Sequence, residues 1–347
     1  AAQTRTAATT AAAAAAAART LDIYFIDVEG GQSTLIVTPA GESMLVDAGF
    51  ASTGTFDSRA ADPASARDPQ RILAVAKAAG LSRIDYMFVT HFHADHVGGV
   101  PELAKLIKIG TFIDHGGINA EAEAGVAGTQ AMVDAYTAAR AGAPHIEPRP
   151  GDRLPLKGLT TTVVSAAGAT ITNALTGAAA GTNAVCVPPG TPAQEKTENP
   201  RSNGFLLQFG RFRFLDVGDL SGPPLFALGC PKDLIGRVDA YLVAHHGGDD
   251  AADPGLYGAL RPRVAIVNNG PRKGGTPPTI RVLQGLKGTD TWALHRSELR
   301  EAENVANDRV ANLDDSTEHW LRLRAREDGS FEVTNGRTGA TVKYPKH

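Results

Sequence analysis

The chain has 347 residues, of which 42% are hydrophobic and 20% are charged, and its formal net charge is −3. That length allows one large domain or two smaller ones. The charge balance excludes the global basic field that indicates nucleic-acid binding. No apolar run approaches the roughly 18 residues of a membrane-spanning helix, so we expect no membrane span.

The N-terminal segment differs in composition from the rest. Residues 1–20 are rich in Ala and show no apolar face, so we expect a disordered leader. An Ala-rich start without Met suits a chain trimmed of a signal peptide, which implies a secreted or periplasmic protein. A shortened chain would look the same. Cys186 and Cys230 pair if the protein is secreted, and two buried thiols are the equal alternative.

The first ninety residues predict strands followed by one helix. Residues 21–28 alternate and predict a strand, and residues 33–49 predict two strands around a Pro-Ala-Gly turn. Residues 51–69 are polar and predict a loop. Residues 68–80 have helical spacing and end at a Gly, so they predict a helix. Residues 84–90 predict a buried strand.

The middle of the chain mixes helices, strands and a long loop. Residues 100–110 predict a helix with Pro in its first turn, and residues 111–117 predict a strand that runs into a loop. Residues 118–142 are an Ala-rich helical stretch, and residues 159–168 predict a strand. Residues 173–201 are rich in Gly, Pro, Asn and Thr and predict a long surface loop, which is often a functional lid.

The last part of the chain predicts a hairpin, two strands, a helix and a final pair of strands. Residues 203–219 read as the hairpin. Residues 238–248 and 262–270 read as strands that end in polar loops, and residues 277–288 read as a helix. Residues 319–344 predict an antiparallel pair with an Asp-Gly turn.

This order of elements indicates the fold class. Strands and helices alternate, but hairpins intervene, which favours a mixed α/β sandwich over a doubly wound parallel sheet. No linker divides residues 21–345, so we expect a single domain there.

One short stretch carries most of the chemistry. In THFHADHVGG, residues 90–99, three histidines and an aspartate (His91, His93, Asp95, His96) follow a predicted buried strand. Imidazole and carboxylate ligands together suit zinc, with manganese or iron as alternatives. The alternative is that these histidines lie on an ordinary surface loop. However, the stretch lies between a strand end and a Gly-Gly turn with a helix, which is the context that a metal site needs.

THFHADHVGG resembles the signature of the metallo-β-lactamase fold superfamily. MLVDAG (44–49), FRFLDVGDL (212–220) and YLVAHHGG (241–248) resemble other elements of that superfamily, in the same order along the chain. The resemblance implies a four-layer αββα sandwich, in which two mixed β-sheets are flanked by helices and the metals lie at one sheet edge.

A narrower resemblance is to the ComEC-type competence-protein hydrolases. It rests on DVEGGQSTLIVTPAGESMLVDAG (27–49), NPRSNGFLLQFGRFRFLDVGDL (199–220) and VNNGPRKGGTPPTIRVLQGL (267–286). Two features depart from that branch. Glu29-Gly30-Gly31 interrupts its opening pattern, and Thr-Pro-Pro stands where its members usually carry His-Pro.

The superfamily resemblance implies the ligands. His91 and His93 would bind a first metal, while Asp95 and His96 would bind a second. Asp219 would bridge both metals or bind the second. His245 would complete the second site, and we expect its neighbour His246 to lie beside the ligands or to face solvent. Asp95 would also be catalytic, orienting the nucleophile or passing a proton to the leaving group.

Other residues would support or complete this site. Asp47 would hold the histidine loop by hydrogen bonds rather than bind metal. Many superfamily members have a third histidine for the first metal, but this chain has no His between Ile146 and Ala244. Asn199 or Ser202 (or Glu198 beside them) could fill that position. His115 could approach the metal or be an ordinary polar residue at a strand end.

The resemblance implies a metal-dependent hydrolase that uses a metal-bound hydroxide, with one or two ions, zinc above all. The ComEC-type likeness favours a phosphodiester, and nucleic acid is included although the net charge does not support it. A lactone, ester or β-lactam is the rival small-molecule substrate, and a non-catalytic metal-binding domain is the rival class. Four loop cations could hold an anion or be solvated charges: Arg201, Arg272, Lys273 and Arg296.

Overall fold

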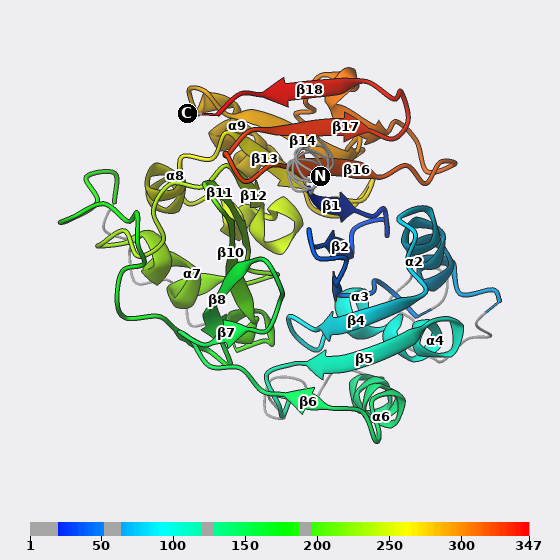
Figure 1. The fold of residues 1–347 in the computed structure, drawn as a ribbon. Coiled ribbons are helices and arrows are strands. Elements are labelled where there is room, and N and C mark those ends of the chain that lie inside the picture. Colours follow the sequence, from blue (N-terminus) through cyan, green and yellow to red (C-terminus); the bar gives the residue numbers. More distant parts are fainter. Residues whose placement is uncertain (1–19, 52–63, 119–127, 187–195, 347) are drawn as a thin grey trace, which may run out of the picture.

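The computed structural model describes residues 20–51, 64–118, 128–186 and 196–346. Among these residues it contains two nine-stranded β-sheets that pack face to face, with helices on both outer faces (Figure 1). The two mixed sheets and their flanking helices are the four-layer arrangement that the sequence resemblance predicted. The expected leader falls almost wholly outside the described residues.

The first sheet contains both ends of the described chain. Its strands are β1 (Leu21–Phe25), β2 (Thr34–Val37), β3 (Ser43–Val46), β4 (Arg83–Phe88), β5 (Lys108–Ile113), β6 (His145–Ile146), β16 (Leu321–Ala325), β17 (Phe331–Asn335) and β18 (Thr341–Tyr344). They lie in the order β18-β17-β16-β1-β2-β3-β4-β5-β6. β3, β4 and β5 are parallel, so their carboxyl ends share one edge.

The second sheet is formed by the later half of the chain. Its strands are β7 (Arg153–Leu154), β8 (Thr160–Ala166), β9 (Ala169–Thr170), β10 (Gly204–Phe209), β11 (Phe212–Asp216), β12 (Ala240–Leu242), β13 (Val264–Val267), β14 (Asp290–His295) and β15 (Val310–Asn312). They lie in the order β15-β14-β13-β12-β11-β10-β8-β7, with β9 paired to β8. The strands from β11 to β15 are all parallel.

The helices divide between the two outer faces. Those near the first sheet are α2 (Arg67–Ala78), α3 (Ala94–Val97), α4 (Val100–Leu106) and α6 (Thr129–Ala139). Those near the second sheet are α7 (Gly222–Gly229), α8 (Pro254–Leu260) and α9 (Pro277–Gly285). Short 3₁₀ turns are η1 (Asn199–Arg201), η2 (Ala244–Gly247), η3 (Asp249–Ala251) and η4 (Asn307–Arg309).

Alternation along the strands accounts for these layers, because successive side chains of a strand point to opposite faces. In β10, Phe205 and Leu207 belong to the core between the sheets, whereas Leu206 packs with the outer helices α7 to α9. In β3, Met44 faces the central core and Leu45 faces the α2–α4 layer. Both faces of each sheet are therefore buried.

Several predicted boundaries were wrong. The helix predicted at residues 100–110 ends at Leu106, and β5 already begins at Lys108. The C-terminal pair predicted at residues 319–344 is three strands, because β18 continues the sheet after β17. Part of the predicted loop at residues 51–69, of the helical stretch at 118–142 and of the long loop at 173–201 lies outside the described residues.

Cys186 and Cys230 form a disulfide. It ties the segment after β9 to the end of α7, where Cys230 is buried. Of the two alternatives left open by the sequence, the paired one is present. Among the described residues, no helix combines the length and apolarity that crossing a membrane requires.

Candidate metal centre

The candidate site lies where parallel strands of both sheets end. Asp47 follows β3, and the histidine stretch follows β4. Asp219 follows β11, and the His245–His246 pair follows β12. Because parallel strands present their carboxyl ends at one edge, loops that are far apart in sequence meet there.

Four buried side chains form a compact group: Asp95, His96, Asp219 and His246. Their nearest ligand atoms all lie within 4.8 Å of one another. His246 Nε2 lies 3.2 Å from both Asp95 Oδ2 and Asp219 Oδ2. His96 Nε2 lies 3.1 Å from Asp219 Oδ2 and 3.4 Å from Asp95 Oδ2. Two imidazoles and two carboxylates therefore point at one small volume.

Asp47 determines which nitrogen of His96 faces this volume. Asp47 Oδ2 lies 2.7 Å from His96 Nδ1 and accepts a hydrogen bond from Thr90 Oγ1 at 2.6 Å. Asp47 Oδ1 accepts from the Thr90 backbone N–H at 2.8 Å. Since a carboxylate can only accept, Nδ1 of His96 carries a proton, and its Nε2 can serve as a metal ligand.

His91 and His245 also face Asp219, at longer distances than His96 and His246 do. His91 Nε2 lies 3.9 Å from Asp219 Oδ2 and 2.9 Å from His93 Nδ1. His245 Nε2 lies 3.7 Å from the same Asp219 oxygen, and its Nδ1 lies 2.7 Å from Asp250 Oδ2. The tandem histidines thus divide their contacts, because His246 approaches both Asp95 and Asp219, whereas His245 approaches Asp219 and Asp250.

This division differs from the sequence expectation. We expected His245 beside Asp95 and His96, and His246 beside the ligands or in solvent. His246 is instead buried within the four-residue group, and His245 is partly exposed. Both residues have positive φ, 48° and 53°, a conformation that turns the two rings in different directions. The residue pattern YLVAHH carries no signal of that backbone twist.

The residues expected to complete the first site lie at different distances from it. Asn199 Nδ2 approaches His245 Nε2 at 3.4 Å, so it lies beside that candidate ligand. His115 Nε2 instead lies 2.9 Å from Glu198 Oε2, and its ring packs on Phe92. Ser202 is buried and accepts a hydrogen bond from Ser165 through its carbonyl.

Two residues that the sequence reasoning missed hold the site together. Asn203 donates from Nδ2 to the Val89 carbonyl and from its backbone to the Thr90 carbonyl, at 3.1 and 2.8 Å. Gln32 receives no role from any motif, yet its backbone N–H donates to the Asp95 carbonyl. Its side chain donates to both oxygens of Asp216 at 3.1 Å. Both residues lie inside stretches that resemble the ComEC-type branch (27–49 and 199–220), but the resemblance gave neither of them a role.

The electrostatics favour positive charge in this volume. Burial alone would raise the pKa of Asp95 and Asp219, but nearby cations hold both pKa values well below the usual value. The cations beside Asp95 are Lys273 and His96, and those beside Asp219 are His246 and His96. Burial would lower the pKa of His96, but Asp219, Asp95 and Asp47 raise it well above its usual value. The three carboxylates thus stabilise positive charge at the His96 ring.

These properties fit a divalent metal ion. Among the described residues, Asp219 Oδ1 is buried and has no hydrogen-bond partner. Such an oxygen loses its hydration without compensation unless a cation or a donor is bound. A mixture of imidazole nitrogens and carboxylate oxygens is a donor set that zinc, manganese and iron all accept.

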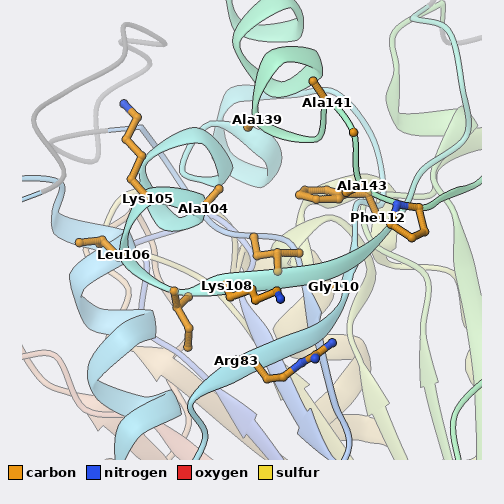
Figure 2. A pocket seen from close by; sticks show the side chains of 14 residues that line it. Arg83, Ala104, Lys105, Leu106, Lys108, Gly110, Phe112, Ala139, Ala141 and Ala143 are labelled. Carbon is orange, nitrogen blue, oxygen red and sulfur yellow. The ribbon is translucent and has the colours of Figure 1, made fainter.

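A surface cavity of about 740 Å³ lies elsewhere (Figure 2). Arg83 and Lys108, at the amino ends of β4 and β5, contribute to its lining. The metal-ligating candidates follow the carboxyl end of β4, so this cavity is at the opposite edge of the sheet. It contains no His, Cys, Asp or Glu, and it has no role in the candidate site.

Comparison with known proteins finds a family model that matches part of the chain. Residues 26–173 match the family model described as the metallo-beta-lactamase superfamily. That segment contains the histidine stretch and Asp47, and the two sheets with their flanking helices agree with the fold of that superfamily. No curated protein matches the chain.

Solved structures with similarity to the chain share little sequence with it. CmlA, a diiron β-hydroxylase from Streptomyces venezuelae, is 15% identical with a TM-score of 0.46, over 79% of this chain and 53% of CmlA. YhfI, a metallo-β-lactamase fold protein from Bacillus subtilis, is 10% identical with a TM-score of 0.42, over 78% of this chain and 95% of YhfI. A metallo-β-lactamase from Cronobacter sakazakii with a HARLDQ motif is 16% identical with a TM-score of 0.38, over 69% of this chain and 89% of that protein. The chain spans about half the length of the CmlA chains that it matches.

Proposed function

We propose that this chain, whose residues 26–173 match the metallo-beta-lactamase superfamily, is a metal-dependent hydrolase that acts on phosphodiesters. The observation that carries the proposal is the buried group of Asp95, His96, Asp219 and His246. His91 and His245 lie 3.9 and 3.7 Å from the same Asp219 oxygen, and His93 lies beside His91. A structural metal site is closed by its ligands, whereas two of the histidines around this group, His93 and His245, are only half-buried. We assign it to catalysis for that reason.

The chain's own residues have separate tasks in this proposal. A bound divalent cation supplies a water of lowered pKa and polarises the substrate oxygen. Asp47 orients His96, and Asp219, which four histidines approach, would contact one ion or both. Asp95 is the candidate catalytic carboxylate, which would orient the nucleophile or pass a proton to the leaving group. We propose zinc, with one or two ions; manganese and iron accept the same donors.

The phosphodiester is favoured over its rivals by the three motifs shared with the ComEC-type branch. A lactone, ester or β-lactam remains the alternative substrate class. The test is hydrolysis of bis-p-nitrophenyl phosphate and of nitrocefin by the metal-loaded full chain. We expect diester hydrolysis that a chelator abolishes and that added zinc restores, without nitrocefin hydrolysis.

Matched variants make this test specific. His96→Ala and His93→Ala should reduce diester hydrolysis by about 100-fold or more, because each removes a candidate ligand. His319→Ala removes a histidine outside the candidate ligand set and should leave the rate unchanged. Nitrocefin hydrolysis without diester hydrolysis would contradict the substrate assignment. Bound metal with no turnover of any of these substrates would favour a non-catalytic metal-binding domain.

We also propose a secreted or periplasmic location, supported by the Cys186–Cys230 disulfide, because such bonds persist in oxidising compartments. Extracellular nucleic acid is one phosphodiester found there. A nuclease assay across a salt series tests it, since binding through phosphates weakens steeply with salt. Cleavage limited to small diesters would restrict the substrate to small molecules.

A further inference from the structure

One of the four loop cations differs from the others in its surroundings. The side chain of Arg272 is 72% exposed and pairs with Glu298, and Arg201 pairs with Glu198 and the Gly117 carbonyl. Arg296 is exposed. Lys273 instead directs its ammonium to Asp95 Oδ2, the oxygen that also lies 3.2 Å from His246 Nε2. Of these four cations, Lys273 is the one that directly contacts a candidate metal ligand.

Close backbone packing places Lys273 there. A Cβ added at Gly30 would lie 2.9 Å from the Lys273 Cβ, so the stem of the side chain runs against the backbone at Gly30. On the other side, the Gly275 N–H donates to the His246 carbonyl at 2.8 Å. A Cβ at Gly274 would come within 2.3 Å of that same carbonyl oxygen. The loop that carries Lys273 is therefore joined to the loop that carries His246.

The Glu29-Gly30-Gly31 stretch has a structural role in this packing. It is one of the two features by which the chain departs from the ComEC-type branch. A Cβ at Gly31 would lie 2.4 Å from the Asp95 carbonyl oxygen. Two adjacent glycines thus let the β1–β2 loop lie against both Asp95 and the stem of Lys273.

We propose that Lys273 is the substrate-anion-binding residue of the metal centre. A divalent ion held by Asp95 competes with the ammonium for Asp95 Oδ2 and repels it, because both are cations. The ammonium then takes an anionic substrate oxygen next to the ions as its partner. A non-bridging phosphate oxygen has the charge and the acceptor geometry for that contact. This inference rests on the proposed function and names the residue that gives it specificity for an anion.

The same contact couples metal binding to anion binding. The Lys273 charge lowers the affinity of the group for a divalent ion, and an anion that neutralises Lys273 restores that affinity. Because such coupling is reciprocal, the metal also tightens anion binding by the same factor. Lys273→Met should therefore raise zinc affinity while weakening anion affinity, which loss of structure alone would not do.

The test uses inorganic phosphate and the zinc-loaded full chain in a calorimetric titration. We expect Lys273→Met to weaken phosphate binding by about tenfold to a hundredfold, since a hydrogen bond to a charged partner is lost. Lys273→Arg should retain most of the affinity. Arg272→Met removes the same charge from the neighbouring position and should bind phosphate as the wild type does. Equal phosphate affinity in Lys273→Met and the wild type would overturn the inference, as would a wild type that binds no phosphate.

A second measurement needs no variant. Phosphate should protect Lys273 of the zinc-loaded wild type from amine acetylation, read by mass spectrometry, more than it protects the exposed Lys105. Equal protection would contradict the proposal even if Lys273→Met fails to fold. If Lys273→Met hydrolyses diesters with the KM and the phosphate affinity of the wild type, the inference is overturned but the proposed function is not. Lys273-dependent phosphate binding without diester hydrolysis would overturn the proposed function alone.

Discussion

A single carboxylate controls the chemistry of His96. In the structure, Asp47 Oδ2 accepts from both Thr90 Oγ1 and His96 Nδ1. Asp47 itself has a positive φ of 58°, which turns its side chain back toward the histidine stretch. A non-glycine residue in that conformation is strained, and strain of this kind is retained where surrounding contacts require it.

Asp47→Asn tests this control. The amide NH₂ at the Oδ2 position would face His96 Nδ1 and favour the tautomer whose proton lies on Nε2. That proton would block the nitrogen that faces the metal group. We expect zinc affinity to fall about 10-fold to 100-fold, measured by competition with a chromophoric chelator. Asp250→Asn changes the corresponding bond at the more exposed His245 and should have the smaller effect; the reverse order would contradict this account.

Asp216 provides a pH-dependent contribution to stability. Burial raises its pKa to about 7, although the Gly218 N–H and Gln32 bind the charged form. The folded protein therefore binds this proton more tightly than the unfolded chain, whose Asp has a pKa of about 3.9. The contribution of Asp216 to the free energy of unfolding thus falls as pH rises from about 4 to about 7.

Asp216→Asn removes that titration. We expect the free energy of unfolding of the variant, relative to wild type, to rise between about pH 4 and pH 7 and to level off above it. Urea denaturation at a series of pH values measures the difference. A difference independent of pH would mean that Asp216 is charged throughout in the folded protein.

At the scale of elements, the Gly-Gly turn after the histidine stretch allows a close backbone contact. A Cβ at Gly99 would lie 2.1 Å from the Ala48 carbonyl oxygen. The Gly99 N–H donates to the Gly49 carbonyl, which joins the entrance of α4 to the end of β3. This contact holds Asp47 and His96 in register across two elements.

Gly99→Ala should therefore lower the free energy of unfolding by about 1–3 kcal/mol, because backbone must move to admit the methyl group. Gly285→Ala is the matched control, since Gly285 ends α9 and a Cβ there meets nothing within 4 Å. That variant should be neutral or slightly stabilising. Urea denaturation compares them, and equal stabilities would show that the contact at Gly99 yields without cost.

Some elements could be predicted and others could not, for physical reasons. β10 is almost wholly buried and β4 is partly buried, and both were predicted from their β-forming residues. β14 and α7 were missed. α7 contains two Pro and two Gly in eight residues, so its local preferences oppose the helix that burial of Leu225 and Leu228 stabilises. β15 has three residues and is a strand only because β14 lies beside it.

At the scale of the whole molecule, the site depends on contacts that no local pattern contains. The resemblance identified Asp95, His96 and Asp219, because each follows a recognisable strand. It could not separate His245 from His246, since that choice depends on two positive φ angles. Nor could it single out Lys273 from the other loop cations, because its contact with Asp95 joins residues 178 positions apart.

The disulfide acts at the same scale. It closes a segment of 44 residues, so it restricts the unfolded chain. Replacing Cys186 and Cys230 together by Ser should lower the free energy of unfolding by about 2–4 kcal/mol. A reducing agent should destabilise the wild type by a similar amount and leave the double variant unchanged. An unaffected wild type would show that the bond is absent or without effect on stability.

Metal binding is the central claim, and a zinc titration of the apoprotein, with metal content verified by elemental analysis, tests it most directly. We predict about one to two zinc ions per chain for the wild type and the Gly285→Ala control, with tight binding lost in His96→Ala. A folded wild-type chain that binds no zinc, manganese or iron would contradict the account.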